Sequence, residues 1–301
     1  PVTVARGMRY WLILANDAGI RTMIIKPTVS LVALLLPMSA LAELQSLDEY
    51  AMSTVSGQSG ISIEMEAQMD IGEIIYTDEG SLAITEVFLG GADRDDLFVE
   101  GYTAANGGTP FIQNVSSLLD DLKLDIDISA EGELSLKFFP VGFAAPVDFS
   151  IRTEAWEIRD ADGAPKFTLI DNFKMDGIFT QLWAKIGYDD ELGTDRLNLE
   201  MMIGIDDLDF DMPALGLAIR DFRMTRSDYD DNPNLLSANA QIEADIYSGQ
   251  NSQGGGALAI DNIGMNADIT VGSIQVGGRS IGSMKVDNLN MVGGSLKIYG
   301  H

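Results

Sequence analysis

Apolar residues recur at every second position over most of the chain, and this period restricts what the chain can fold into. It is clearest in Leu122–Ile128 and Leu134–Phe138, which are separated by the turn residues 130–132. Side chains of a strand point alternately to the two faces of a sheet, so each segment can bury only one face. This pair predicts a β-hairpin with one apolar and one charged face. The same period recurs in Phe149–Ile151, Leu197–Ile205, Ile242–Ile246 and Met265–Val271.

No stretch after residue 60 keeps a helical spacing of apolar residues over the length of a normal helix. We therefore predict an all-β fold of many amphipathic antiparallel strands. One-sided strands must bury their apolar faces against one another, which favours an elongated sandwich or a β-roll. An outer-membrane β-barrel is the alternative, although only 8% of the residues are aromatic and no aromatic girdle is apparent.

A weak internal repeat places an acidic or amide pair between two short apolar stretches. It occurs at Asp171-Asn172, Asp261-Asn262 and Asp287-Asn288, with a looser copy at Arg220-Asp221. The intervals of 50, 40 and 26 residues are too unequal for a solenoid. Asn and Asp side chains bond to the local backbone, so we predict a bend at a strand junction. Convergence of similar strands on similar turns explains the likeness equally well.

Charge and residue usage exclude several classes of function. The net charge of −27 repels nucleic acid, whose binding depends on clustered cations. The chain has no cysteine, and its one histidine is the last residue, His301. Zinc sites of the usual ligand types and serine nucleophiles with a histidine base therefore lack their components. We predict that the protein is not an enzyme.

The N-terminal part of the sequence resembles an export signal. Lys26 precedes the apolar run Val29–Leu36, and Pro37 and Ala40-Leu41-Ala42 follow it. A basic start, a short apolar run and an A-x-A end are typical of a cleaved signal peptide. The expected organisation is an upstream extension at 1–22, a signal peptide at 23–42, a short helix with a glycine-rich junction at 43–60, and one β-rich domain at 61–301. The expected location is the periplasm, the outer-membrane surface or the outside of the cell.

Acidic clusters are the candidate binding sites. Calcium takes six to eight oxygen ligands, and proteins outside the cell use weak calcium sites. The hypothesis of a calcium site rests on clustered carboxylates, and charge runs are more often solvated turns and outward strand faces. No other cofactor is expected. The calcium candidates are Asp206, Asp207, Asp209, Asp228, Asp230 and Asp231.

One segment resembles a known family. After the export signal, a Leu-x-x-Leu-Asp stretch leads into a motif of the form Val-x-Gly-Gln-x-Gly-Ile-x-Ile, which is similar to the mature start of the FilA-like pilus-system proteins of Gram-negative bacteria. The likeness covers about twenty residues and implies export, a β-rich body and a part in a surface filament or adhesive system. It implies no catalytic residues. The matching positions are Val55, Gly57, Gln58, Gly60, Ile61 and Ile63.

We therefore predict a non-enzymatic exported structural or surface protein, such as a pilus-associated subunit or adhesin. The expected partners are other surface or pilus-system proteins or further copies of the chain, with association with the outer membrane as a further expectation. The alternatives are a periplasmic binding module for an apolar ligand, a calcium-dependent adhesin and the outer-membrane barrel. Amphipathic strands and 14 methionines would suit an apolar groove.

Overall fold

The computed structural model describes residues 2–4, 60–110, 112, 115–142 and 146–300. One compact unit contains Pro1–Leu14 and Ile61–His301, and Ala15–Gly60 are assigned to a second unit. The predicted signal peptide at 23–42 and all but the last residue of the predicted segment 43–60 lie outside the described residues.

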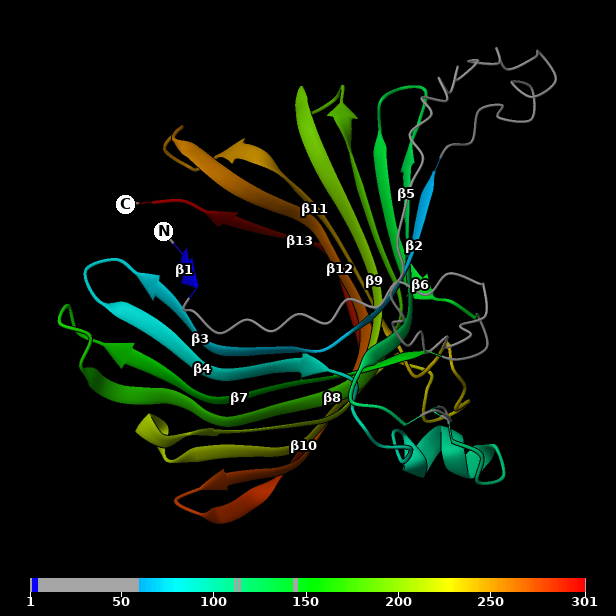
Figure 1. Cartoon of the computed structure of the whole chain (residues 1–301), viewed down its shortest axis with the longest axis vertical. Coiled ribbons are helices and arrows are strands. Elements are labelled where there is room, and N and C mark those ends of the chain that lie inside the picture. The colour runs from blue at the N-terminus through cyan, green and yellow to red at the C-terminus, as the bar shows by residue number, and fades with distance from the viewer. Residues whose placement is uncertain (1, 5–59, 111, 113–114, 143–145, 301) are drawn as a thin grey trace, which may run out of the picture. The chain divides into compact units, whose positions relative to one another are not determined.

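The prediction of an all-β fold with amphipathic antiparallel strands is confirmed. All thirteen described strands belong to one antiparallel sheet that curls on itself (Figure 1). Their bounds are β1 Val2–Val4, β2 Ile61–Ala67, β3 Met69–Thr77, β4 Ser81–Gly90, β5 Leu119–Ile128, β6 Leu134–Pro140, β7 Val147–Arg159, β8 Pro165–Asp189, β9 Thr194–Met212, β10 Leu217–Thr225, β11 Ala240–Gln250, β12 Gly256–Val276 and β13 Arg279–Ile298.

Long strands join two halves of the sheet. β8, β9, β12 and β13 each cross both halves, and shorter strands pair with one part of them. The first half-sheet has the order β2-β5-β6-β8-β9-β11-β12-β13, and the second has the order β3-β4-β7-β8-β9-β10-β12-β13. β1 pairs with the outer edge of β3 at Ile74–Tyr76, so residues predicted to be an upstream extension contribute a strand.

The predicted hairpin is present as β5 and β6. Leu124 pairs with Phe138, and Ile126 pairs with Leu136. Gly132 in the connecting turn has φ of +84°, a left-handed conformation that glycine adopts without steric cost. The hairpin forms where the period of two and the turn chemistry agree.

The repeat marks β-bulges inside β8, β10, β12 and β13, so the prediction that it lies at strand junctions is wrong. Asn172, Asp221, Asn262 and Asn288 all have φ between +51° and +56°. Register shifts lie beside each of them, where two residues of one strand face one residue of its neighbour. Asn and Asp tolerate the left-handed conformation better than other side chains that carry a Cβ. Bulges bend and twist a strand, so these positions add to the curvature of the long strands seen in Figure 1.

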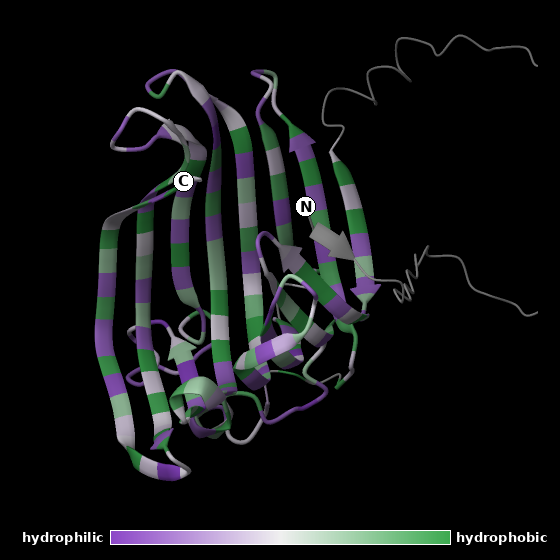
Figure 2. Cartoon of the chain, turned by 90° about the vertical axis from the view of Figure 1, so that its left-hand side faces the viewer, coloured by the Kyte–Doolittle hydropathy of each residue, from purple (hydrophilic) through white to green (hydrophobic). Residues whose placement is uncertain are grey.

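One face of the sheet is apolar across its full width. In the first half-sheet, a row that we call row A crosses eight strands, and in the second half-sheet row B does the same. Figure 2 shows the alternation of apolar and polar residues along the strands. Row A is Ile63, Leu124, Phe138, Leu182, Met201, Ile242, Met265 and Met291, and row B is Met69, Leu89, Ile151, Met175, Leu208, Phe222, Val271 and Met284.

The two halves pack together where the sheet bends. A buried cluster of Ile205, Met224, Ala240 and Ala267 is contacted by Met175, Leu208 and Phe222 of row B and by Ile242 and Met265 of row A. The two rows therefore line the same, inner face of the sheet. Burial at this junction supplies the apolar stabilisation that a flat single sheet would lack.

Loops cover the opposite face near the bend. A second cluster contains Leu97, Phe98 and Ile112 from the segment between β4 and β5, together with Ile178 of β8 and Tyr229. This segment includes a short π-helix, Val99–Thr103, and a 3₁₀-helix, Pro213–Leu215, follows β9. Among the described residues, no helix has the length and apolar character needed to span a bilayer.

Candidate functional site

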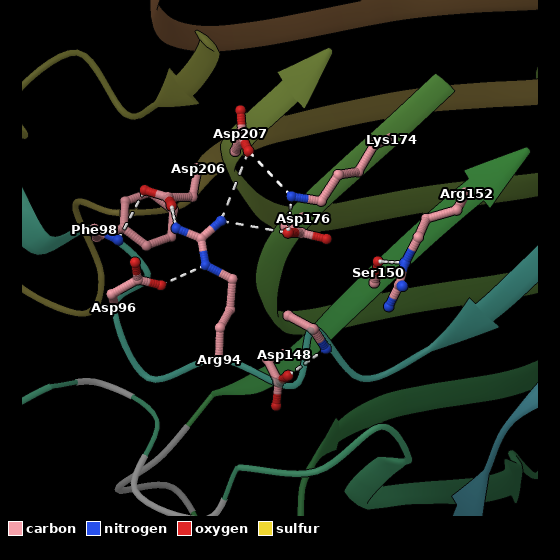
Figure 3. Close-up of polar contacts among 11 residues, drawn as sticks. Arg94, Asp96, Phe98, Asp148, Ser150, Arg152, Lys174, Asp176, Asp206 and Asp207 are labelled. Atoms are coloured by element: carbon pink, nitrogen blue, oxygen red, sulfur yellow. Dashed lines mark hydrogen bonds and ion pairs between the residues drawn. The ribbon is translucent and has the colours of Figure 1, made fainter. Parts of the chain in front are cut away.

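Buried charges on β8 and β9 fasten the segment after β4 to the sheet. Arg94 extends from this segment toward the strands and forms an ion pair with Asp96 of its own segment (Figure 3). Its guanidinium lies 3.3 Å from a carboxylate oxygen of Asp176 on β8 and 3.3 Å from one of Asp206 on β9. We call these four residues the Arg94 cluster.

A bulge in β9 turns Asp206 toward Arg94. Asp176 pairs with Asp207 and Gly177 pairs with Ile205, so Asp206 is an extra residue without an opposite partner on β8. Such a residue redirects its side chain out of the regular alternation. One oxygen of Asp206 accepts a hydrogen bond from the backbone N–H of Phe98 at 2.7 Å.

Asp148 likewise accepts a backbone N–H from the segment after β4, near the start of that segment. Its carboxylate accepts a hydrogen bond from the backbone N–H of Ala92 at 2.6 Å, and the residue is only 3% exposed. Two carboxylates on the sheet thus accept N–H groups of the segment, one near its start and one at Phe98, whose φ is +57°. Buried backbone N–H groups need such acceptors, because leaving them unpaired is costly.

Burial is the largest cause of the shifted pKa of both carboxylates. Removal from water raises the pKa of Asp148 to about 6, against the pull of the Ala92 N–H. Burial likewise raises the pKa of Asp206 to about 6, against the Phe98 N–H and the charge of Arg94. For Arg94, burial opposes the charged form, but the hydrogen bond to Asp96 and the charge of Asp206 outweigh it, so its pKa is raised.

Asp176 is the most deeply placed carboxylate of the cluster. It is 1% exposed, and one of its oxygens lies 2.9 Å from the ammonium of Lys174 and 3.3 Å from Arg94. Its other oxygen is buried without a hydrogen-bond partner among the described residues. The two cations that face this one oxygen offset the cost of burying the carboxylate charge.

The candidate calcium ligands do not form one site. Asp206 and Asp207 belong to the network around Arg94, and Asp207 also lies 3.3 Å from Lys174. In the segment after β10, Asp228 pairs with Arg226 at 2.6 Å, and Asp230 pairs with Lys285 at 2.9 Å. Asp231 is exposed.

One group of carboxylates among the described residues has the spacing of metal ligands. Oxygens of Asp207, Asp209 and Asp221 lie within 4.8 Å of one another, and we call these residues the carboxylate triad. Asp209 already accepts the backbone N–H of Asp221 at 2.8 Å. A cavity of about 500 Å³ beside the triad is lined by charges of both signs, including Arg94 and Arg223. Arg94 and Lys174 already face Asp207, which disfavours a calcium ion at the triad, and calcium binding itself stays an untested prediction.

Several residues of this region were not predicted from the sequence. Asp148, the pair Lys174 and Asp176, and Asp221 lie far apart in the chain, and the alternating pattern of their strands gave no sign that they would meet. Arg94 carried a signal, since it is the one cation in the acidic run Asp93–Asp96. A lone cation among acids needs partners elsewhere only if the run is buried, and the sequence did not reveal that burial.

These features define a protein built on one curled antiparallel sheet, in which buried carboxylates and one arginine hold a long segment against the outer face. Residues 22–130 match a family of unknown function, DUF6160. This match includes the motif from Val55 to Ile63 and ends just after β5. No curated protein and no solved structure matches the chain.

Proposed function

We propose that the protein is a non-enzymatic structural component of the cell surface that functions by joining its sheet to other molecules. The observation that supports this proposal is the sheet itself. Its apolar inner face crosses eight strands in each half, and among the described residues both edges of the sheet are largely open. Open edges carry unpaired N–H and C=O groups that accept another strand.

The charges of the Arg94 cluster fit the same proposal. Its carboxylates accept backbone N–H groups or face cations, which is an arrangement that fixes a loop. Export, which the segment 23–42 predicts, and the resemblance to pilus-system proteins would place such a sheet at the cell surface. The resemblance supports a role at the cell surface and implies no catalytic residue.

Cell fractionation and imaging test this proposal. A strain without the gene should lose a surface structure or adhesive property, and a strain that carries the gene should hold the protein in an envelope or extracellular fraction. A strictly cytoplasmic product together with an unchanged cell surface would contradict the proposal.

A second candidate function is the binding of an apolar ligand on the inner face. A third apolar row in the first half-sheet contains exposed side chains, among them Ile128 at 74% and Leu296 at 49% exposed. An acyl chain laid on this row would shield it from water, and burial of apolar area favours such binding. Native mass spectrometry of the protein purified from cells tests this candidate, and the absence of any co-purified apolar molecule would count against it.

A further inference from the structure

We propose that the chain joins to further copies of itself head to tail, with β13 of one copy adding to the β2–β3 edge of the next. This inference rests on the proposed structural role and names the partner as a second copy. It follows from the direction, charge and bulge pattern of the two edges.

The two edges run in opposite directions across the whole sheet. β2 and β3 are separated by Gln68 alone, so Ile61–Thr77 form one edge that crosses both half-sheets, while β13 forms the opposite edge. All pairings are antiparallel, and each half-sheet has eight strands. An even number of alternating strands leaves edges of opposite direction, so β13 placed beside β2–β3 of another copy continues the antiparallel alternation.

The edges are opposite in charge. Residues 61–77 carry four carboxylates and no cation, a net charge of −4. β13 carries three cations and one carboxylate, a net charge of +2, in a chain whose net charge is −27. Charge complementarity therefore favours the head-to-tail pair and disfavours β13 against β13 or β2–β3 against its own copy.

The apolar rows meet in register at this junction. Row A runs from Ile63 at one edge to Met291 at the other, and row B runs from Met69 to Met284. The ends lie six residues apart on one edge and seven on the other. The additional residue belongs to the bulge at Asn288, so both rows align across the junction at the same time.

The same bulge makes the edge selective. The β12–β13 ladder is interrupted by five register shifts, and a straight strand cannot follow it. Proteins use such bulges to prevent indiscriminate pairing of edges. An edge that is itself bent between its two half-sheets, as β2–β3 is, suits this ladder better than an unrelated strand does.

Exposed apolar side chains near β13 and the pairing of β1 with β3 support the use of these two edges for association. Eight of the large exposed apolar residues lie within residues 276–299, including Val292, which is 82% exposed. β1 occupies β3 at Ile74–Tyr76 in the antiparallel direction that β13 would take, so this edge accepts an added strand. Among the described residues, no strand covers the outer side of Ile61–Glu73. Because the contact uses two different surfaces, copies add without closing into a pair and give a filament or a ring.

Cysteine trapping in the full-length protein tests the register, since the chain has no cysteine of its own. Paired residues of neighbouring strands have Cα atoms about 4.5–5.5 Å apart, which is within disulfide range. We expect mild oxidation to link Met291→Cys to Ile63→Cys when the two variants are mixed. A chain carrying both substitutions should give a ladder of trimers and larger species. Leu215→Cys, which is exposed on the short 3₁₀-helix between the non-edge strands β9 and β10, measures random collision.

Charge reversal tests the driving force. In sedimentation velocity, Lys285→Glu should abolish association of the full-length chain, whereas Lys185→Glu makes the same charge change away from both edges and should preserve it. A dimer linked only through Met291→Cys on both copies, or linkage no greater than that of Leu215→Cys, would overturn the inference. If the cysteine pair is not trapped but the protein is found at the cell surface, head-to-tail self-association is rejected and the proposed surface role is kept. Trapping without a surface location would reject the surface role alone.

Discussion

Replacement of Asp148 by Asn should remove a defined part of the dependence of stability on pH. The carboxylate is buried and accepts the Ala92 N–H at 2.6 Å, and it has no ion pair among the described residues. The side-chain oxygen of Asn can accept the same hydrogen bond without a charge. The variant therefore isolates the effect of ionising this one group.

The sign follows from the direction of the shift. Burial raises the pKa of Asp148 in the folded protein to about 6 from 3.8, so between these values the folded state holds a proton that the unfolded state has released. This contribution to stability is fully present below pH 3.8 and is lost as the pH rises through about 6. A shift of about two pKa units corresponds to about 3 kcal/mol in total, of which about 1.3 kcal/mol is lost between pH 5 and pH 7.

Denaturant unfolding of the wild type and of Asp148→Asn, measured from pH 5 to pH 7.5, tests this reasoning. This range stays above the isoelectric point of about 4.1, where solubility falls. The difference in unfolding free energy should change in favour of the variant as the pH rises. Asp228→Asn is a control whose difference from wild type should stay constant over this range, because the hydrogen bond from Arg226 lowers the pKa of Asp228 and its carboxylate is therefore ionised in both states above pH 5. A difference between wild type and Asp148→Asn that stays constant with pH would refute the assignment.

Three further outcomes are expected. Gly204→Ala should cost several kcal/mol or prevent folding, because an added Cβ would lie 2.1 Å from the carbonyl oxygen of Ala238, whereas Gly72→Ala meets nothing within 4 Å and should unfold at about the wild-type temperature. Asn262→Val and Asn262→Gly both lose the hydrogen bond to Asp245, but Val should cost about 1–2 kcal/mol more unfolding free energy than Gly because φ there is +51°. Equal losses in both variants would count against a conformational cause. Melting temperatures in millimolar calcium and in a chelator should agree within about 2 °C, because cations already lie beside the carboxylate triad, and a clear rise with calcium would establish a binding site.

The features of the fold that the sequence predicted are those set by local chemistry. The hairpin of β5 and β6 is determined by alternating apolar residues and a turn that contains glycine, and both features lie within about twenty residues of sequence. The repeat at Asn172, Asn262 and Asn288 predicted bends because Asn and Asp bond to the local backbone, and in the structure these residues take the left-handed conformation that Asn tolerates. Such features depend on neighbours in the chain, so a single sequence carries them.

The Arg94 cluster could not be predicted because it depends on register between distant strands. Asp206 faces Arg94 only because β9 has an extra residue opposite β8, and a shift of one residue would turn other side chains to that side. The order of the strands in the first half-sheet could not be predicted either. β8 pairs with β7 along its first part and with β6 along its second part, and alternation alone is compatible with either partner throughout.

The bulges connect the shape of the sheet with the way in which it can associate. A regular flat edge of twenty residues could pair with any extended chain. The register shifts along β12 and β13 interrupt the edge and so reduce such non-specific pairing. One of these shifts lies between Ala267 and Ile269 of β12, which both pack in the buried cluster around Ile205. A sequence change that straightened β13 at Asn288 would therefore act in two ways. It would weaken the packing of the two halves, and it would also misalign Met284 and Met291 with the rows of a neighbouring copy, so stability and selective assembly depend on the same backbone conformation.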